Sequence, residues 1–210
     1  PAVDGWISVM ARAAVPAFIK DSGAVIYLDP FKRLSGASCF WADNEKAGWV
    51  AGEYCRKKGW RTAFVLHESQ KESPASYQER WQGARSAFEG KKKHLLSEPL
   101  VLPLADEGGA SRQKSAQFYE RLKQEKIEAL ITTSDLLSCC ILRDSRKLGW
   151  SVPGDMRLIG IDNLLQSRLM SPSITTVDIG ALELGRQAAQ HILNHLEKKS
   201  GEFRPPEPRL

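Results

Sequence analysis

The stretch ALITTSDLLSCCILRDSRKLGWSVPGDMRLIGIDN, residues 129–163, decides the fold class of this chain. It begins with an apolar run over residues 129–133 and ends with another over residues 157–161, and each run predicts a strand. Between them, apolar residues at helical spacing predict a helix over residues 136–148. Both strands are apolar throughout rather than alternating, which is typical of parallel strands that helices cover on both faces. The stretch therefore predicts one β-α-β unit of an α/β fold.

The same alternation of short apolar runs and longer amphipathic stretches continues on both sides of this unit. Further strands are predicted over residues 3–10, 24–29, 37–42, 62–67 and 100–104, and further helices over residues 12–22, 44–58, 75–88, 111–124 and 182–197. Asp43 is predicted to cap the helix over 44–58, and Gly59 to end it. The whole chain is thus predicted to be α/β, with mostly parallel sheets covered by helices.

The composition is that of a packed globular protein. Of the 210 residues, 42% are hydrophobic and 26% are charged, which excludes a wholly disordered or fibrous chain. The apolar runs are far shorter than the roughly 20 residues that span a bilayer, so we expect no membrane partner. The net charge of +5 comes with lysine and arginine runs that fall where helices are predicted to end. We interpret these runs as solvated helix ends rather than as a nucleic-acid site.

Several kinds of catalytic and cofactor site are not indicated. The glycines do not follow the phosphate-loop or dinucleotide-binding patterns, so we expect no nucleotide cofactor. The four cysteines lack the spacing of a zinc site or of a secreted disulfide framework, so we expect no metal. His191 and His195 lie four residues apart on one predicted helix without a third ligand nearby, and we interpret them as helix surface. No signal peptide is visible, which makes the cytoplasm the default expectation.

Polar residues follow several predicted strands at the edge where ligands bind in such folds. Asp29 ends one strand, Ser134 and Asp135 follow another, and Asp162 follows a third. In open α/β sheets, loops and helix N-termini meet at the carboxyl ends of the strands and form ligand sites there. Arg80 differs because it lies within a helix that comes after a further strand. These five residues are the first candidates for a binding site.

Several short motifs along the chain carry a family resemblance. They are VDGWI at 3–7, VIYLD at 25–29, ADNEKAG at 42–48, the R-x-x-G pair Arg80 and Gly83, VPGDMRLIGIDN at 152–163, and PSITTV at 172–177. In this order they closely resemble the effector-binding domain of LacI/GalR-family transcriptional regulators. The chain departs from the family at Gly59-Trp60-Arg61, where a histidine usually replaces the tryptophan. The resemblance covers nearly all of the chain.

The resemblance implies a two-lobed fold like that of periplasmic sugar-binding proteins. The N-terminal lobe would comprise residues 1–42 and 179–201, and the C-terminal lobe residues 43–178 and 202–210, with three crossovers between them. Family members begin with a helix-turn-helix headpiece and two further β-α units, which this sequence does not contain. We therefore expect an N-terminally truncated form whose first lobe is incomplete. Contact with operator DNA would require the absent headpiece.

The resemblance also implies a function. A small polar effector, by family analogy a sugar, would bind between the lobes and shift their relative orientation. In a homodimer this shift would control operator binding. The implied role is that of a sensor and not of an enzyme.

The family's effector contacts fall at positions that match Asp29, Arg80 and Asp162, with Ser134 and Asp135 beside them. Carboxylates accept hydrogen bonds from sugar hydroxyls, and a guanidinium donates two parallel bonds to neighbouring oxygens. Structural alternatives stay open: a helix cap or strand-end turn for each aspartate, a surface salt bridge for Arg80, and capping of the next helix for Ser134.

Two tryptophans complete the candidate site. Trp41 at a lobe crossover and Trp81 beside Arg80 each have a ring that could stack on a sugar or a purine. Packing in the core is the alternative for both of them.

Two other functions share these residue types. A periplasmic solute receptor has the same fold and similar contacts, but the forms GIDN at 160–163 and ITT at 174–176 favour the regulators. A glycoside hydrolase could use Asp29 and Asp162 as an acid-base pair. The resemblance to regulators makes both the weaker hypotheses.

Overall fold

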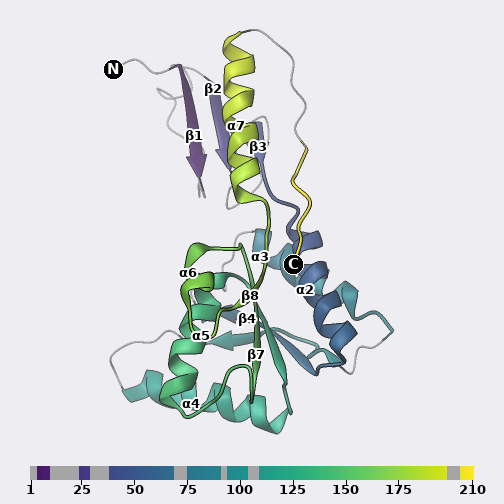
Figure 1. Cartoon of the computed structure of the whole chain (residues 1–210), viewed down its shortest axis with the longest axis vertical. Coiled ribbons are helices and arrows are strands. Elements are labelled where there is room, and N and C mark those ends of the chain that lie inside the picture. Colours follow the sequence, from purple (N-terminus) through teal and green to yellow (C-terminus); the bar gives the residue numbers. More distant parts are fainter. Residues whose placement is uncertain are drawn as a thin grey trace.

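The computed structural model describes residues 4–9, 24–28, 38–68, 75–90, 94–103, 109–197 and 204–210. The helix predicted over residues 12–22 and the candidate residue Asp29 lie outside these ranges. The described chain forms two lobes, a smaller one that contains the N-terminal strands and a larger one below it in Figure 1. None of the described helices combines the length and the apolar character that crossing a membrane requires.

The smaller lobe is built, as far as it is described, from a three-stranded sheet and one long helix (Figure 1). The strands β1 (Gly5–Val9), β2 (Ala24–Leu28) and β3 (Ser38–Phe40) are parallel and lie in this order, and α7 (Ala181–Leu196) packs along them. A small core of four side chains joins helix and sheet: Ile26, Phe40, Leu184 and Ala188. The ring of His191 packs edge to face on Phe40 with 5.1 Å between centroids, so His191 is part of this contact rather than free helix surface.

In its described residues, the larger lobe is a five-stranded parallel sheet with helices on both faces. Its strands lie in the order β5 (Leu100–Leu102), β4 (Thr62–His67), β6 (Ala129–Thr132), β7 (Arg157–Ile161) and β8 (Thr175–Val177). Helices α2 (Asn44–Lys58) and α3 (Ala75–Ala87) cover one face, and α4 (Gly109–Gln124) and α5 (Asp135–Lys147) cover the other. The short helix α6 (Leu165–Leu169) precedes β8 and contacts α5.

Two separate hydrophobic cores explain why the strands of the larger lobe are apolar throughout. Along β7, Ile159 packs into the core under α2 and α3, whereas Leu158 packs into the core under α4 and α5. Along β6, Ile131 and Leu130 divide in the same way. Successive side chains of a strand point to opposite faces, so a sheet covered on both sides must be apolar at every position.

The caps predicted for the helix over 44–58 are confirmed. The Asp43 Oδ1 atom accepts a hydrogen bond from the Lys46 backbone N–H at 2.8 Å, which satisfies one of the open donors of the first turn. Gly59 ends α2 in the left-handed conformation with φ of 73°, which a residue with a side chain rarely adopts. The basic run at residues 56–58 forms the last turn of this helix, as predicted.

The prediction of an α/β fold with mostly parallel sheets is confirmed, since every pairing between the described strands is parallel. Most element boundaries agree within about two residues. Two elements were missed, α6 and β8, which contain five and three residues. Such short segments do not establish a periodicity, and β8 is an edge strand whose first residue, Thr175, is exposed.

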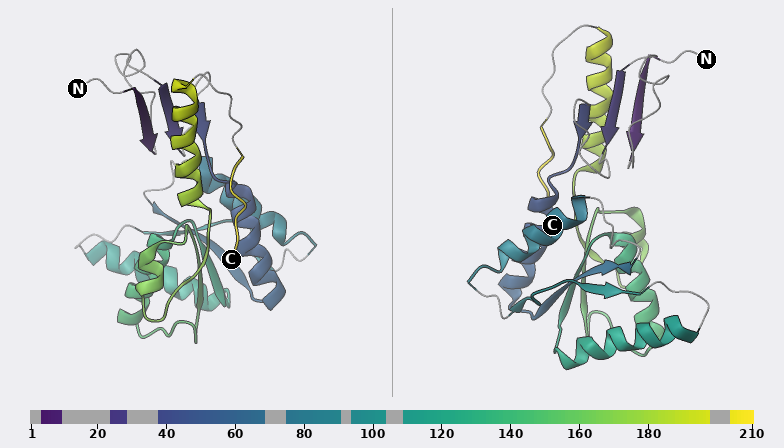
Figure 2. Two further views of the ribbon diagram at one scale, coloured as in Figure 1. Left: turned by 45° about the horizontal axis from the view of Figure 1, so that its top comes forward. Right: turned by 180° about the vertical axis from the view of Figure 1, so that it is seen from behind.

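Described segments that pass between the lobes lie close together (Figure 2). Residues 41–43 lead from β3 into α2, residues 178–180 lead from β8 into α7, and the C-terminal tail returns beside the second of these. The tail pairs with it through two backbone hydrogen bonds, from Asp178 N–H to the Arg209 carbonyl (2.7 Å) and from Arg209 N–H to the Asp178 carbonyl (3.0 Å). The tail residue Pro206 fills the space where a side chain on Gly180 would lie.

Candidate functional site

Arg80 lies at the centre of the candidate site. It is only 3% exposed, and its guanidinium contacts one carboxylate and two neutral oxygens. Its Nη1 atom lies 2.9 Å from Asp162 Oδ1 and donates a hydrogen bond to the Thr133 carbonyl at 2.6 Å. Its Nε atom donates to Asn44 Oδ1 at 2.8 Å. Burial of a charge is tolerated only with such pairing, so Arg80 draws together α2, α3 and the segments after β6 and β7.

Two glycines allow α2 and α3 to come close enough to place Arg80. A Cβ atom on Gly48 of α2 would overlap the Arg80 carbonyl, and a Cβ atom on Gly83 of α3 would overlap the Glu45 carbonyl. Gly83 follows Arg80 by three residues and therefore lies on the same side of α3. The R-x-x-G spacing thus has a structural reason: the glycine brings the helices into contact at the point where the arginine enters the site.

Asp162 is aimed at Arg80 by an unusual turn after β7. Asp162 and Asn163 have φ of 128° and 56°, values that residues with side chains seldom adopt. The turn is held by two hydrogen bonds to β8, from Asp162 N–H to the Val177 carbonyl (2.9 Å) and from Asn163 N–H to Thr176 Oγ1 (3.2 Å). Backbone strain of this kind persists where the surroundings over-determine the conformation, and it is common at ligand sites.

Asp135 stabilises this turn through hydrogen bonds. Its side chain is fully buried, and its Oδ2 atom accepts a hydrogen bond from Leu164 N–H at 2.8 Å. Its Oδ1 atom accepts from Thr176 Oγ1 at 2.5 Å. Gly160 of β7 leaves the room for this carboxylate, because a Cβ atom there would overlap Asp135 Oδ1. Asp135 therefore anchors the loop that carries Asp162, and its assignment as an effector contact stays a prediction.

Ser134 caps the helix that follows it, which was the structural alternative to an effector contact. It is the N-cap of α5, and its Oγ atom accepts a hydrogen bond from Leu137 N–H at 3.4 Å. The residue is buried, next to the Thr133 carbonyl that Arg80 contacts. Its assignment as an effector contact also stays a prediction.

The two tryptophans occupy different surroundings. Trp81 packs against the core under α2 and α3, with its ring centroid 5.5 Å from that of Phe64 and the two rings tilted by 51°. Trp41 is half-buried in the segment between β3 and α2. The structure thus gathers Arg80, Asp162, Ser134 and Asp135 at one edge of the sheet, whereas Asp29 lies outside the described residues.

One polar side chain of the cluster, Asn44, was missed from the sequence. Asn44 is 2% exposed, accepts from Arg80 Nε, and donates from its Nδ2 atom to the Ala42 carbonyl at 3.1 Å. A signal was present: Asn44 comes three residues before Ala47 and four before Gly48, which places a polar residue on the buried face of α2. Asparagine near the start of a helix is commonly a capping residue, and that interpretation conceals its place on the buried face.

Within the described ranges, no three His, Cys, Asp or Glu side chains gather in a way that could hold a metal ion. What the cluster offers is a buried guanidinium and a partly exposed carboxylate at the carboxyl edge of a parallel sheet. This pair can exchange its internal contacts for hydrogen bonds to a polar ligand.

Comparison with known proteins places this geometry in a family. A model of the periplasmic binding protein-like domain matches residues 53–210. The NTD biosynthesis operon regulator NtdR of Bacillus subtilis is 36% identical over 82 residues, which are 38% of this chain and 25% of that protein. The HTH-type transcriptional repressor PurR of Haemophilus influenzae is 31% identical over 120 residues, which are 55% of this chain and 36% of that protein. The chain thus spans about a quarter to a third of the length of these relatives.

Solved structures agree on the fold. The crystal structure of a LacI family transcriptional regulator from Enterococcus faecium with bound ribose superimposes with a TM-score of 0.76. The match is 23% identical in sequence and covers 99% of this chain and 77% of that one. A complex described as transcriptional regulator CelR with cellobiose superimposes with a TM-score of 0.69 at 22% identity, covering 95% of this chain and 61% of that one. These similarities show a shared two-lobed architecture.

Proposed function

The chain belongs to the periplasmic binding protein-like domain family, in the form of a LacI-family effector-binding domain, and from this premise we propose that it senses a small sugar between its lobes. The proposal assigns residues 1–42 and 179–201 to the N-terminal lobe, and residues 43–178 and 202–210 to the C-terminal lobe. Binding of the sugar controls the affinity of the regulator for operator DNA in the cytoplasm. No catalytic step is part of this function.

The observation that carries the proposal is the cluster of the buried Arg80 and Asn44 with the partly exposed Asp162, at the carboxyl ends of the strands, from which the crossover 178–180 leads to the smaller lobe. Sugar hydroxyls are both donors and acceptors, and each one buried without a partner costs about 1 to 3 kcal/mol. A guanidinium and a carboxylate side by side supply both kinds of partner. The ribose and cellobiose named for the two structural neighbours support a sugar as the ligand class.

The candidate residues either contact the sugar or support the residues that do. Arg80 and Asp162 contact the sugar from the larger lobe, and Asp29 contacts it from the smaller one. Ser134 and Asp135 act next to them, mainly by holding the loops after β6 and β7 in place. Trp41 and Trp81 bound the site with their rings. A ligand that touches both lobes stabilises one relative orientation and so shifts the population toward it.

The proposal is tested by calorimetric titration of the full chain with D-ribose and with cellobiose. We expect one of them to bind. Arg80→Ala should weaken that binding by about 10-fold to 100-fold, because the variant loses a charge-assisted hydrogen bond to the sugar. Arg85→Ala, an exposed arginine on the same helix, is the matched control and should leave the affinity unchanged. A thermal melt of each variant separates lost binding from lost folding. Equal affinity of Arg80→Ala and the unmodified chain would remove Arg80 from the site.

The proposal includes a homodimer, for which an exposed leucine surface is the support. Leu165 and Leu169 are 65% and 75% exposed and lie one turn apart on the same side of α6. Leu136, at the start of α5, is also exposed, and the bond between Asp135 and Leu164 holds the starts of the two helices side by side. Exposed apolar groups that cluster in this way mark interaction surfaces. We name Leu136, Leu165 and Leu169 the leucine surface.

A further inference from the structure

A cavity of about 490 Å³ lies at the end of the larger lobe remote from Arg80. Its lining includes the first residues of two parallel strands, Arg157 of β7 and Thr175 of β8, whereas Asp162 follows the last residue of β7. The two strands run in the same direction, so the cavity residues Arg157 and Thr175 lie at the amino ends of the strands and Asp162 lies at the carboxyl ends. The cavity is therefore separate from the proposed sugar site, and its volume is within the range of small-molecule pockets.

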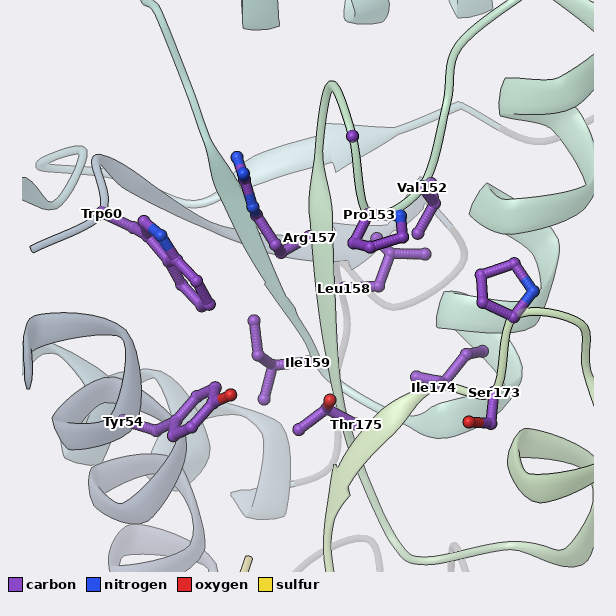
Figure 3. A pocket seen from close by; sticks show the side chains of 12 residues that line it. Tyr54, Trp60, Val152, Pro153, Arg157, Leu158, Ile159, Ser173, Ile174 and Thr175 are labelled. Carbon is purple, nitrogen blue, oxygen red and sulfur yellow. The ribbon is translucent and has the colours of Figure 1, made fainter. Parts of the chain in front are cut away.

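The walls of this cavity are mainly apolar and partly aromatic. Figure 3 shows Tyr54 and Trp60 on one side, Pro153 on the other and Ile159 between them. The rings of Tyr54 and Trp60 meet edge to face with centroids 5.7 Å apart and planes at 78°. Both rings are half-buried, so their positions are set by the core while part of each ring remains accessible. Such walls accept a flat ring by stacking and by burial of apolar surface.

Arg157 gives the cavity its chemical selectivity. Among the described residues that line the cavity, Arg157 is the single charged one, and none of them is acidic. The guanidinium lies over the Trp60 ring, with 5.5 Å between Cζ and the ring centroid, and this cation-π contact holds it in place. Within the described part of the chain, this guanidinium makes no hydrogen bond and no ion pair. A half-buried cation without an anion favours a ligand that brings one.

We propose that this cavity is a second ligand site, which binds a small ring compound carrying a carboxylate. The ring lies between the Tyr54–Trp60 pair and Pro153, and the carboxylate pairs with the Arg157 guanidinium. The hydroxyl groups of Ser173 and Thr175, both exposed at the cavity, are available to a further polar group of the ligand. The site is independent of Arg80, so it stands whether or not the chain senses a sugar.

The test titrates the full chain with indole-3-acetate and benzoate, each compared with its neutral alcohol, and follows binding by calorimetry. We expect both carboxylates to bind, and the alcohols to bind at least about tenfold more weakly because they lack the charge. Arg157→Gln should remove this preference for the charged ligands. The matched control, Arg121→Gln, changes an exposed arginine of α4 away from the cavity and should bind like the unmodified chain.

A second measurement locates the bound compound. In nitrogen-15 correlation spectra, the Trp60 indole N–H signal should shift with indole-3-acetate, and it should do so equally in Arg80→Ala. Any of these results would overturn the proposal: no binding of either carboxylate, equal binding by Arg157→Gln, or shifts confined to other tryptophans. Dissociation of an assembly of this chain on addition of the compounds would instead assign the cavity to a contact between copies, which also overturns it.

Discussion

At the scale of single residues, Asn44 connects the candidate site to the segment between the lobes. One end of its amide accepts from Arg80, and the other donates to the carbonyl of Ala42, which lies in the crossover from β3 to α2. Both ends are used in a nearly fully buried position, so the amide has one orientation and no substitute partner in water. A displacement of this crossover therefore strains the hydrogen bond between Asn44 and Arg80, and a movement of Arg80 strains the bond between Asn44 and the crossover.

Asn44→Ala should lower the free energy of unfolding by about 1 to 3 kcal/mol, because the Arg80 Nε donor and the Ala42 carbonyl each lose a buried partner. Urea unfolding followed by circular dichroism measures this loss. Gln82→Ala removes an amide from the exposed side of α3 and should change stability by less than about 0.5 kcal/mol. If the two variants were equally stable, the Asn44 bridge would have no energetic role.

The cysteines should differ sharply in reactivity. Burial raises the pKa of the Cys55 thiol to about 12, so at pH 8 this group stays protonated and does not act as a nucleophile. Cys140 is exposed on α5 and accessible to reagents. We expect iodoacetamide to alkylate Cys140 in the folded chain and Cys55 only after denaturation, as measured by peptide mass spectrometry. Modification of Cys55 under native conditions at the rate of Cys140 would contradict this packing.

At the scale of elements, the packing of α2 against α3 positions the side chains of the candidate site. Glycines at the two points of closest approach let backbone meet backbone, and the helices carry Asn44 and Arg80 into hydrogen-bond distance of each other. Neither glycine is explained by a turn, since both lie inside helices, where glycine costs about 1 kcal/mol relative to alanine. Close approach is the compensating gain.

Gly83→Ala should destabilise the chain by about 1 to 3 kcal/mol, because the added methyl group meets the Glu45 carbonyl and pushes the helices apart. It should also weaken sugar binding by displacing Arg80. The control is Gly185→Ala in α7. Apart from neighbouring residues of the same helix, no atom of the described chain lies within 4 Å of the added Cβ, so this change should stabilise by about 0.5 to 1 kcal/mol. Thermal unfolding gives both signs, and a stabilised Gly83→Ala would refute the close contact.

At the scale of the whole molecule, each lobe has its own sheet and its own core, and narrow backbone segments join them. The C-terminal tail adds a third segment by pairing with the crossover at Asp178, where Arg209 Nη2 also lies 3.7 Å from Asp178 Oδ2. Two compact bodies joined by narrow segments are the arrangement that the proposed function requires, because a sugar that contacts both of them would favour one relative orientation.

The leucine surface should decide the oligomeric state. Leu165→Glu and Leu169→Glu each place a charge in the proposed contact between two copies, so we expect either change to convert a dimer into monomers. Sedimentation velocity over a range of concentrations measures this. Leu182→Glu is the control, since Leu182 is 91% exposed but lies on α7, away from the leucine surface. A monomeric unmodified chain, or an unaltered dimer in both variants, would exclude this surface.

The sequence by itself determined the class of fold, the strands Thr62–His67 and Arg157–Ile161, the caps of α2, and the residue types of the candidate site. These follow from local causes: periodicity, turn chemistry and the polarity of strand ends. Only the tertiary structure decided that Arg80 meets Asp162, that Asn44 bridges them to the crossover, and that Asp135 anchors a loop. Residues 44, 80, 133 and 162 are far apart along the chain, and their contact depends on how the helices and strands pack. The short elements α6 and β8 exist for the same reason, because packing rather than intrinsic propensity stabilises them.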